Sequence, residues 1–223
     1  HIMDIKLFEK NLDKTFKITN FSGQDKDVLL STFKCNLYKG LKKGDNFYEK
    51  DTVTKLIENV NEDSIIIDGG CNIGVHTIAL ALKGVNKIYA FEPNIYSYTL
   101  LVKNILNNNL KNVIPINKGL SISPQNLNVK FKSKNFFDDN CGGFTIGHQE
   151  EGELITNIDI TTIDTLNLDR LDLIKLDTEG YEERAIKGGL ETIKKYKPII
   201  ILEDWSTQVI NGKMCPDVNI EKT

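Results

Sequence analysis

The chain has 223 residues, of which 40% are hydrophobic and 26% are charged, and its formal net charge is −3. A chain of this size and composition buries one sizeable core, so we expect a single domain over residues 4–223. Its lysines and arginines form no cluster, which disfavours a nucleic-acid partner. No apolar run approaches the roughly 20 residues of a membrane-spanning helix. The opening His1-Ile2-Met3 resembles the remnant of a cleaved purification tag.

The chain has four widely separated cysteines: Cys35, Cys71, Cys141 and Cys215. They form no Cys-x-x-Cys pair, so the pattern indicates neither a zinc site nor a disulfide framework. Such cysteine usage is typical of a reducing compartment. We therefore expect the protein to be cytoplasmic.

The N-terminal segment, residues 4–60, predicts a cap of short strands followed by a helix over 50–59. From Ser64 onward, short runs rich in β-branched residues alternate with helical stretches. This alternation predicts parallel strands joined by helices. The expected strands are 64–68, 87–91 and 112–117, and the expected helices between them are 74–83 and 95–107.

The alternation breaks over residues 122–160, where two or three antiparallel strands are expected around a polar loop at 136–147. It resumes with a strand over 171–177, a helix over 181–196 and a strand over 198–203. The pattern predicts an α/β fold: a mostly parallel, Rossmann-like sheet flanked by helices, with a small β insertion between its third and fourth strands. Because connections at the carboxyl edge of a sheet build specificity, we expect the insertion to lie over the part of the site that selects the substrate.

The strongest local signal is the loop from Asp68 through Gly69-Gly70-Cys71-Asn72-Ile73 to Gly74, between the first strand of this alternation and a helix. A dinucleotide fingerprint counted from Gly70 needs its second glycine at Asn72, and the side chain there disfavours a pyrophosphate. A carboxylate at Asp68 suits an ammonium group, and backbone N–H groups near Gly70 suit a carboxylate. The loop therefore favours a ligand that carries an amino-acid group over NAD.

Glu92 is the second signal, because it ends the next expected strand. A carboxylate at this place can accept hydrogen bonds from both ribose hydroxyls. The alternative is an acid that is merely solvated at a strand end. Its combination with the glycine loop favours the binding role.

Several motifs resemble, in order, those of the FkbM family of methyltransferases. They are Asp68-Gly-Gly-Cys-Asn-Ile-Gly74, Ala90-Phe-Glu-Pro-Asn94, Ile163-Asp-Thr-Leu166 and Ile174-Lys-Leu-Asp-Thr-Glu-Gly-Tyr-Glu182, with Tyr48-Glu49 upstream and Ala185-Ile-Lys-Gly-Gly189 downstream. The resemblance covers residues 46–203. It implies a class I methyltransferase fold, S-adenosylmethionine as donor, and a hydroxyl acceptor on a sugar, a glycan or a secondary metabolite.

The resemblance also implies which residues hold the donor. The glycine loop would bind the methionine part of the donor, and the acid after the second strand would bind the ribose. The segment after the third strand would border the adenine. These residues are Asp68, Gly70, Asn72 and Gly74 for the methionine, Glu92 for the ribose, and Asn117 to Ser121 for the adenine. One departure concerns the end of the sheet, since only 18 residues follow Trp205 where the family's fold has an antiparallel hairpin. Completion of the acceptor site by another subunit therefore remains open.

The catalytic base is expected at Asp177 or Glu179, after the fourth strand. An alcohol is a weak nucleophile at neutral pH, and a positioned carboxylate accelerates its reaction by roughly 10²–10⁴-fold when it takes the proton. The structural alternative is that Asp177 or Thr178 caps the following helix. His76, at the start of a helix, is a further candidate base, although a histidine there is more often a packing residue.

A divalent metal is a variant of this hypothesis. Asp177 and the pair Glu203-Asp204 follow neighbouring strands, and their oxygen ligands would suit Mg²⁺ or Mn²⁺. Acids at strand ends are more often solvated, so the metal remains the less favoured alternative.

Two other classes of protein compete with an O-methyltransferase. A non-catalytic module would bind S-adenosylmethionine without turnover, and an NAD-dependent oxidoreductase is disfavoured by Asn72. Methyltransferases acting on base amines often carry Asn/Asp-Pro-Pro-aromatic after the fourth strand, whereas this chain has Asp177-Thr-Glu-Gly180. This difference favours oxygen as the acceptor atom.

Overall fold

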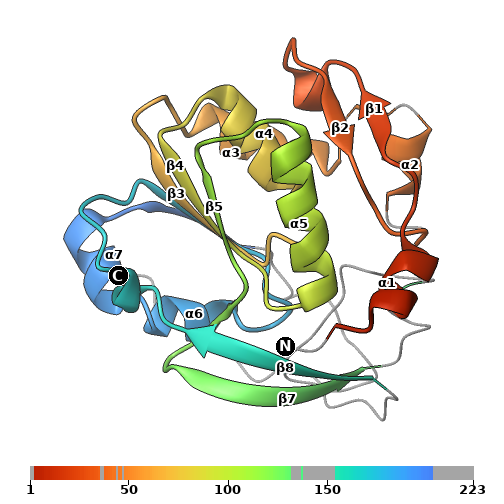
Figure 1. Ribbon diagram of the computed structural model, residues 1–223. Coiled ribbons are helices and arrows are strands. Elements are labelled where there is room, and N and C mark those ends of the chain that lie inside the picture. The colour runs from red at the N-terminus through yellow and green to blue at the C-terminus, as the bar shows by residue number, and fades with distance from the viewer. Residues whose placement is uncertain are drawn as a thin grey trace, which may run out of the picture.

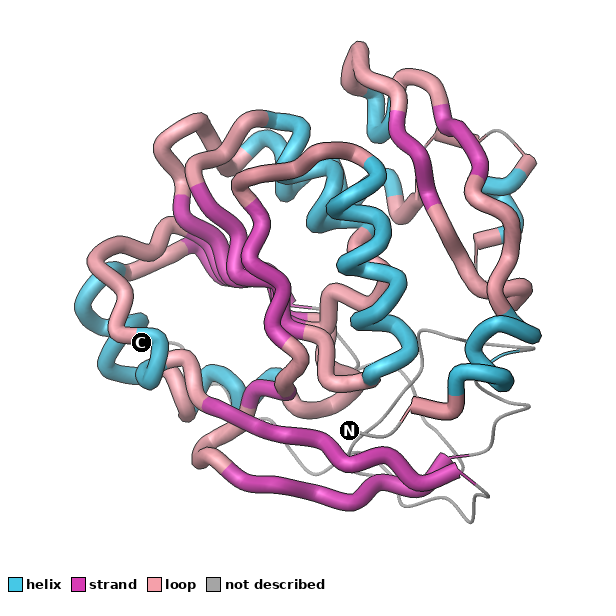
Figure 2. The backbone as a smooth tube through the Cα atoms, in the orientation of Figure 1, coloured by secondary structure: helices cyan, strands magenta, loops and turns pink. Residues whose placement is uncertain are grey.

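A parallel sheet of five strands forms the centre of the computed structural model, which describes residues 3–35, 38–43, 45–46, 48–131, 137 and 154–202. The strands are ordered β10-β9-β3-β4-β5, and each neighbouring pair is parallel. Their bounds are β3 Ile65–Gly69, β4 Lys87–Phe91, β5 Val113–Ile116, β9 Leu173–Leu176 and β10 Ile199–Leu202. The predicted α/β fold with a mostly parallel sheet is confirmed (Figures 1 and 2).

The chain reverses its direction of travel across the sheet at β3. From β3 it adds β4 and β5 on one side, and it later returns to add β9 and β10 on the other. Ligands of open α/β sheets bind at the carboxyl ends of the strands beside such a reversal. The fold therefore directs attention to the ends of β3, β4 and β9.

Helices cover both faces of the sheet (Figure 1). One face packs against α3 Lys50–Glu58, α4 Val75–Lys83 and α5 Ile95–Asn107. The other face packs against α6 Glu182–Lys187 and α7 Leu190–Tyr196. Local sequence explains the start of α5, where the Asn94 side chain accepts the N–H of Tyr96 and so satisfies one of the unpaired donors of the helix end.

The N-terminal segment contains more helix than its sequence predicts. It has α1 Ile5–Asn11, the antiparallel pair β1 Phe16–Ile18 and β2 Val28–Leu30, and α2 Lys39–Lys42. These elements share an apolar cluster with α4 and α5. The predicted helix over 50–59 is confirmed as α3. No helix in the described ranges is long and apolar enough to cross a membrane.

The insertion after β5 is built on an antiparallel pair, as its sequence predicts. β7 Gln125–Phe131 pairs with β8 Leu154–Thr161, and the short β6 Gly119–Leu120 pairs with β8 in parallel. Since β6 follows β5 almost directly, this small sheet begins at the carboxyl edge of the central sheet (Figure 1). Most of the expected loop at 136–147 lies outside the described residues.

Two expectations are wrong. The helix expected over 181–196 is two helices, α6 and α7, separated at Gly188-Gly189. Cys35 is disulfide-bonded, although the sequence suggested no disulfide, and its partner lies outside the described residues. Since disulfides are typical of oxidising compartments, this bond does not favour the cytoplasmic localisation, which stays a prediction.

Gly188, the C-cap of α6, is closely packed, and this packing gives a stability prediction. A Cβ atom added to Gly188 would stand 2.0 Å from the Ser121 carbonyl oxygen. Gly188→Ala should therefore lower the free energy of unfolding by about 1–3 kcal/mol through overpacking. Gly40→Ala is the matched control, because its Cβ would meet no atom closer than 3.5 Å, and Gly40 is helical. Urea denaturation of both variants checks this, and equal stabilities would contradict it.

Candidate functional site

The candidate site lies where β3 and β9 end beside each other. Gly70 follows β3 in a left-handed conformation with φ of +73°, and a Cβ atom there would stand 1.7 Å from the Asp177 carbonyl oxygen. Only glycine permits so close an approach of the two strand ends. The loop after β3 and the segment after β9 therefore form one surface.

An ion pair crosses between these two strands. Asp68 on β3 and Lys175 on β9 are register partners, and the Lys175 Nζ lies 3.3 Å from an Asp68 carboxylate oxygen. Asp68 is 0% exposed and Lys175 is 4% exposed. The other Asp68 oxygen accepts the hydroxyl of Thr77, on α4, at 2.6 Å. Both oxygens of this buried carboxylate thus face a partner within the protein.

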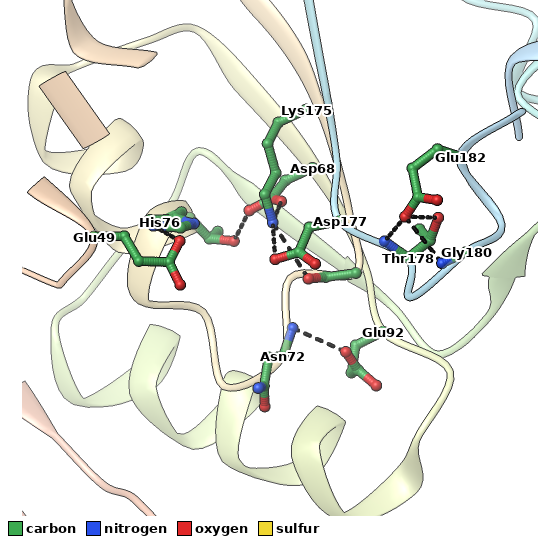
Figure 3. A network of polar contacts seen from close by, with 12 residues as sticks. Glu49, Asp68, Asn72, His76, Glu92, Lys175, Asp177, Thr178, Gly180 and Glu182 are labelled. Atoms are coloured by element: carbon green, nitrogen blue, oxygen red, sulfur yellow. Dashed lines mark hydrogen bonds and ion pairs between the residues drawn. The ribbon is translucent and has the colours of Figure 1, made fainter. Parts of the chain in front are cut away.

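Lys175 also reaches the two segments that leave the strands. Its Nζ lies 3.5 Å from an Asp177 carboxylate oxygen and 3.4 Å from the Gly70 carbonyl oxygen (Figure 3). Burial alone would lower the pKa of the Lys175 ammonium, but the Asp68 and Asp177 carboxylates outweigh burial and raise that pKa above its usual value. Lys175 is therefore a cation at neutral pH.

Glu92 follows β4 and organises the neighbouring loop. One carboxylate oxygen accepts the backbone N–H of Asn72 at 2.8 Å, and the other accepts the N–H of Asn94 at 2.8 Å. Burial raises the pKa of Glu92 to about 7, against the effect of these hydrogen bonds and of Lys175. Glu92 thus titrates near neutral pH, and it is not the solvated acid that the alternative interpretation required.

Two buried polar atoms flank Glu92 without a hydrogen-bond partner. They are the Asn72 side-chain oxygen and the Asn94 side-chain nitrogen. Asn72 also has a φ of 51°, in the left-handed region. Buried polar atoms without partners are rare in proteins, and a ligand is one reason for them. Asn117 closes the same edge, since its amide donates to the Glu92 carbonyl at 2.8 Å.

The segment after β9 presents Glu179. The Glu182 carboxylate accepts the N–H groups of Thr178 at 2.6 Å and Gly180 at 3.3 Å, and so fixes the turn between them (Figure 3). Glu179 sits in this turn with a φ of 52°. Burial, followed by the charges of Asp177 and Glu182, raises the pKa of Glu179 to about 7. The alternative in which Asp177 or Thr178 caps the helix is wrong, because Tyr181 is the N-cap and no side chain bonds there.

His76 does not resemble an active base in this environment. Its Nε2 lies 3.5 Å from a Glu49 carboxylate oxygen, and its ring is 5.9 Å from the Tyr48 ring. Burial, aided by the charge of Lys175, lowers the pKa of His76 to about 4. So weak a base is poorly matched to proton abstraction at neutral pH, which favours a packing role.

Other predicted site residues have mixed outcomes. Gly74 is the N-cap of α4 with a φ of +90°. Ser121 is buried, donates its N–H to the Thr161 carbonyl and packs against Gly188, so its position is explained by packing. In the described ranges no three His, Cys, Asp or Glu side chains gather as a metal site requires. Glu203 and Asp204 lie outside those ranges, so the metal stays a prediction.

Sequence reasoning missed four residues of this site: Thr77, Asn94, Lys175 and Glu182. The one available signal was Lys175, a charged residue inside an otherwise apolar strand. Lysine is rarely fully buried unless it is paired, so its position in Leu173–Leu176 could have indicated an internal ion pair. The other three reveal their roles only through contacts across the fold.

The strand order, the glycine loop after β3 and the acid after β4 together define a class I, Rossmann-like methyltransferase fold. A family model for the methyltransferase FkbM domain matches residues 68–214, which is more than half of the chain. The chain therefore belongs to the FkbM methyltransferase family, and the resemblance of its motifs is confirmed.

Individual relatives match over shorter stretches. The hexuronic acid methyltransferase AglP of Haloferax volcanii is 33% identical over 82 residues, which cover 37% of this chain and 33% of AglP. The chain thus matches about a third of that relative's length. The crystal structure of methyltransferase FkbM from Methylobacillus flagellatus KT has a TM-score of 0.48 at 20% identity, covering 64% of this chain and 33% of that one. The crystal structure of M. jannaschii TYW2 in complex with AdoMet has a TM-score of 0.33 at 29% identity, covering 40% of this chain and 38% of that one.

Thr77→Val tests the support of the buried carboxylate. Valine has a similar shape but leaves one Asp68 oxygen without its donor, so we expect a loss of about 1–3 kcal/mol in the free energy of unfolding. Thr99→Val is the matched control, because the Thr99 hydroxyl bonds to the neutral Ile95 carbonyl in its own helix. Chemical denaturation measures both. A Thr77 variant as stable as the control would show that the hydrogen bond is unimportant.

Proposed function

We propose that the protein transfers a methyl group from S-adenosylmethionine to a hydroxyl group of a sugar or glycan. The observation that carries the proposal is the place of Glu179, a half-buried carboxylate in the turn that Glu182 fixes after β9, at the switch point of a methyltransferase fold. The family supports methyl transfer. The sugar is supported by the match to AglP, whose name gives its substrate as hexuronic acid.

The residues present fit the donor. When bound, S-adenosylmethionine supplies a methyl group on a positively charged sulfur. Its amino-acid end would lie along the Gly70–Asn72 backbone, whose N–H groups suit a carboxylate. Its ribose would donate hydrogen bonds to Glu92, whose neighbours Asn72 and Asn94 carry the two unpartnered buried polar atoms. Asp68 is enclosed by Thr77 and Lys175, so we assign it an indirect role in shaping this loop.

The acceptor side is assigned to Glu179, with Asp177 as its charged neighbour. An ionised Glu179 would take the hydroxyl proton as the oxygen bonds to the methyl carbon, while the methyl–sulfur bond breaks and S-adenosylhomocysteine leaves. A base is most effective when its pKa lies near the working pH, and the pKa of about 7 meets that condition. Asp177 is paired with Lys175, which makes it the weaker candidate.

Radiolabelled S-adenosylmethionine, offered with a panel of sugar glycosides that includes hexuronic acids, tests the proposal. Label that moves to a sugar supports it, and label that moves only to non-sugar alcohols identifies a methyltransferase of small metabolites instead. Donor binding without transfer to any acceptor favours a non-catalytic module. A parallel series with excess chelator tests Mg²⁺ or Mn²⁺, since retained activity would exclude a required metal.

Glu179→Gln tests the assignment of the base. We expect kcat to fall by about 10²–10⁴-fold, because glutamine cannot accept the proton. In the unmodified protein kcat should rise as the pH increases through about 7, since Glu179 must lose its own proton first. The variant should lose this rise. Glu183→Gln is the control, because Glu183 pairs with Lys187 on the surface of α6. Equal kcat values for the two variants would refute the assignment.

Glu92→Gln tests the ribose contact by calorimetry with S-adenosylhomocysteine, the donor without its methyl group. Hydrogen bonds to a charged acceptor contribute about 1.5–3 kcal/mol, so we expect roughly 10–100-fold weaker binding. Since the ionised carboxylate is the acceptor, affinity should increase as the pH rises through about 7, and only in the unmodified protein. Glu58→Gln, at the exposed end of α3, is the control. If Glu92→Gln binds S-adenosylhomocysteine as tightly as the unmodified protein does, and neither affinity changes with pH, the ribose contact is contradicted.

A further inference from the structure

We propose that Lys175 is a positioning residue that ties the donor loop after β3 to the acceptor-side carboxylate Asp177. This inference rests on the proposed function, since it assigns a role within the same site. Lys175 need not touch either substrate to act in this way. It acts through the groups that its ammonium holds in place.

The geometry of the ammonium carries the inference. Its Nζ lies within 3.5 Å of three oxygens, one each from Asp68, Gly70 and Asp177. Asp68 belongs to β3, Gly70 to the loop proposed for the donor, and Asp177 to the segment that leads to Glu179. Figure 3 shows the Lys175 side chain pointing between the Asp68 and Asp177 carboxylates. One buried cation thus joins the two halves of the site.

The strand register explains why a lysine can do this. Asp68 and Lys175 are opposite each other on adjacent strands, so their side chains leave the sheet on the same side. The long lysine side chain extends past Asp68 to the strand ends. A shorter residue at this position would reach Asp68 but not the Gly70 carbonyl or the Asp177 carboxylate. A neutral one would leave Asp68 buried without a countercharge, which is strongly unfavourable.

The charge of Lys175 also affects the pKa values of other groups in the site. It lowers the pKa of Glu49, Glu92, Glu179, Cys71 and His76 relative to what burial and the other charges would give. These groups come from the N-cap of α3, from α4, from the glycine loop, and from the segments after β4 and β9. The acids Asp177 and Glu182 oppose this effect at Glu179.

The test compares the unmodified protein with Lys175→Met combined with Asp68→Asn. The second change removes the carboxylate that the first would leave unpaired, so that the variant is expected to fold. Lys187→Met is the control, because Lys187 forms a surface pair with Glu183. Circular dichroism checks folding, calorimetry measures S-adenosylhomocysteine affinity, and carboxyl-carbon NMR follows the titration of Glu179.

We expect the double variant to bind S-adenosylhomocysteine at least tenfold more weakly than the control. We also expect the pKa of Glu179 to rise, because the Lys175 charge that lowers it is removed. Affinity within twofold of the control, or an unchanged Glu179 titration, would overturn the inference. If even the unmodified protein binds no S-adenosylhomocysteine, the proposed function fails, and the Glu179 titration still tests Lys175.

Asp177→Asn gives a second test that does not disturb the buried pair. S-adenosylhomocysteine lacks the sulfonium charge, so Asp177 should affect its binding mainly through Lys175. We expect a loss of affinity of about threefold or more, the order of a coupling between residues in contact, and no further loss when Asp177→Asn is added to the double variant. Unchanged affinity in the single variant, or an equal loss in both backgrounds, would show that Asp177 and the donor loop are not joined by Lys175.

Discussion

The buried ion pair between Asp68 and Lys175 is the interaction on which the rest of the site depends. It joins β3 to β9, two strands that are far apart in the sequence but adjacent at the point where the sheet reverses direction. A carboxylate that is 0% exposed requires a partner: Lys175 forms an ion pair with one of its oxygens, and the Thr77 hydroxyl donates to the other. The same ammonium then has contacts left for Gly70 and Asp177. The contacts of Lys175 therefore both stabilise the core and hold the segments of the site in place.

The carboxylates around this pair differ in their environments, and these differences separate their roles. Asp68 is enclosed between Lys175 and Thr77. Glu92 and Glu179 are held by backbone N–H groups or by a turn, and burial raises the pKa of each to about 7. In the proposed function, Asp68 shapes the loop after β3, Glu92 accepts hydrogen bonds from the ribose, and Glu179 takes the proton of the acceptor.

Much of the fold could be predicted because it depends on local patterns. Runs such as Ile65-Ile66-Ile67 form buried parallel strands, and Asp68 and Glu92 stand at strand ends where ligands bind. The contacts made by Lys175, Thr77 and Glu182 could not be predicted in the same way, since each joins residues that only tertiary structure brings together. The close packing of Gly188 against Ser121 is similar, because the two residues are far apart in the sequence. A charged residue inside an apolar strand, such as Lys175, is the local signal that indicates a buried ion pair.

The most direct test of the account is to map donor binding on the protein by amide NMR, titrating S-adenosylhomocysteine into the isotopically labelled chain. The account predicts the largest shift changes at Gly70 to Asn72 and at Glu92 to Asn94, with smaller changes at Asp177 and Glu179. The β1–β2 pair at the N-terminal side should remain unaffected. Saturable changes confined to that pair, or no changes at millimolar ligand, would contradict the assignment of the donor site to the carboxyl edge of the sheet.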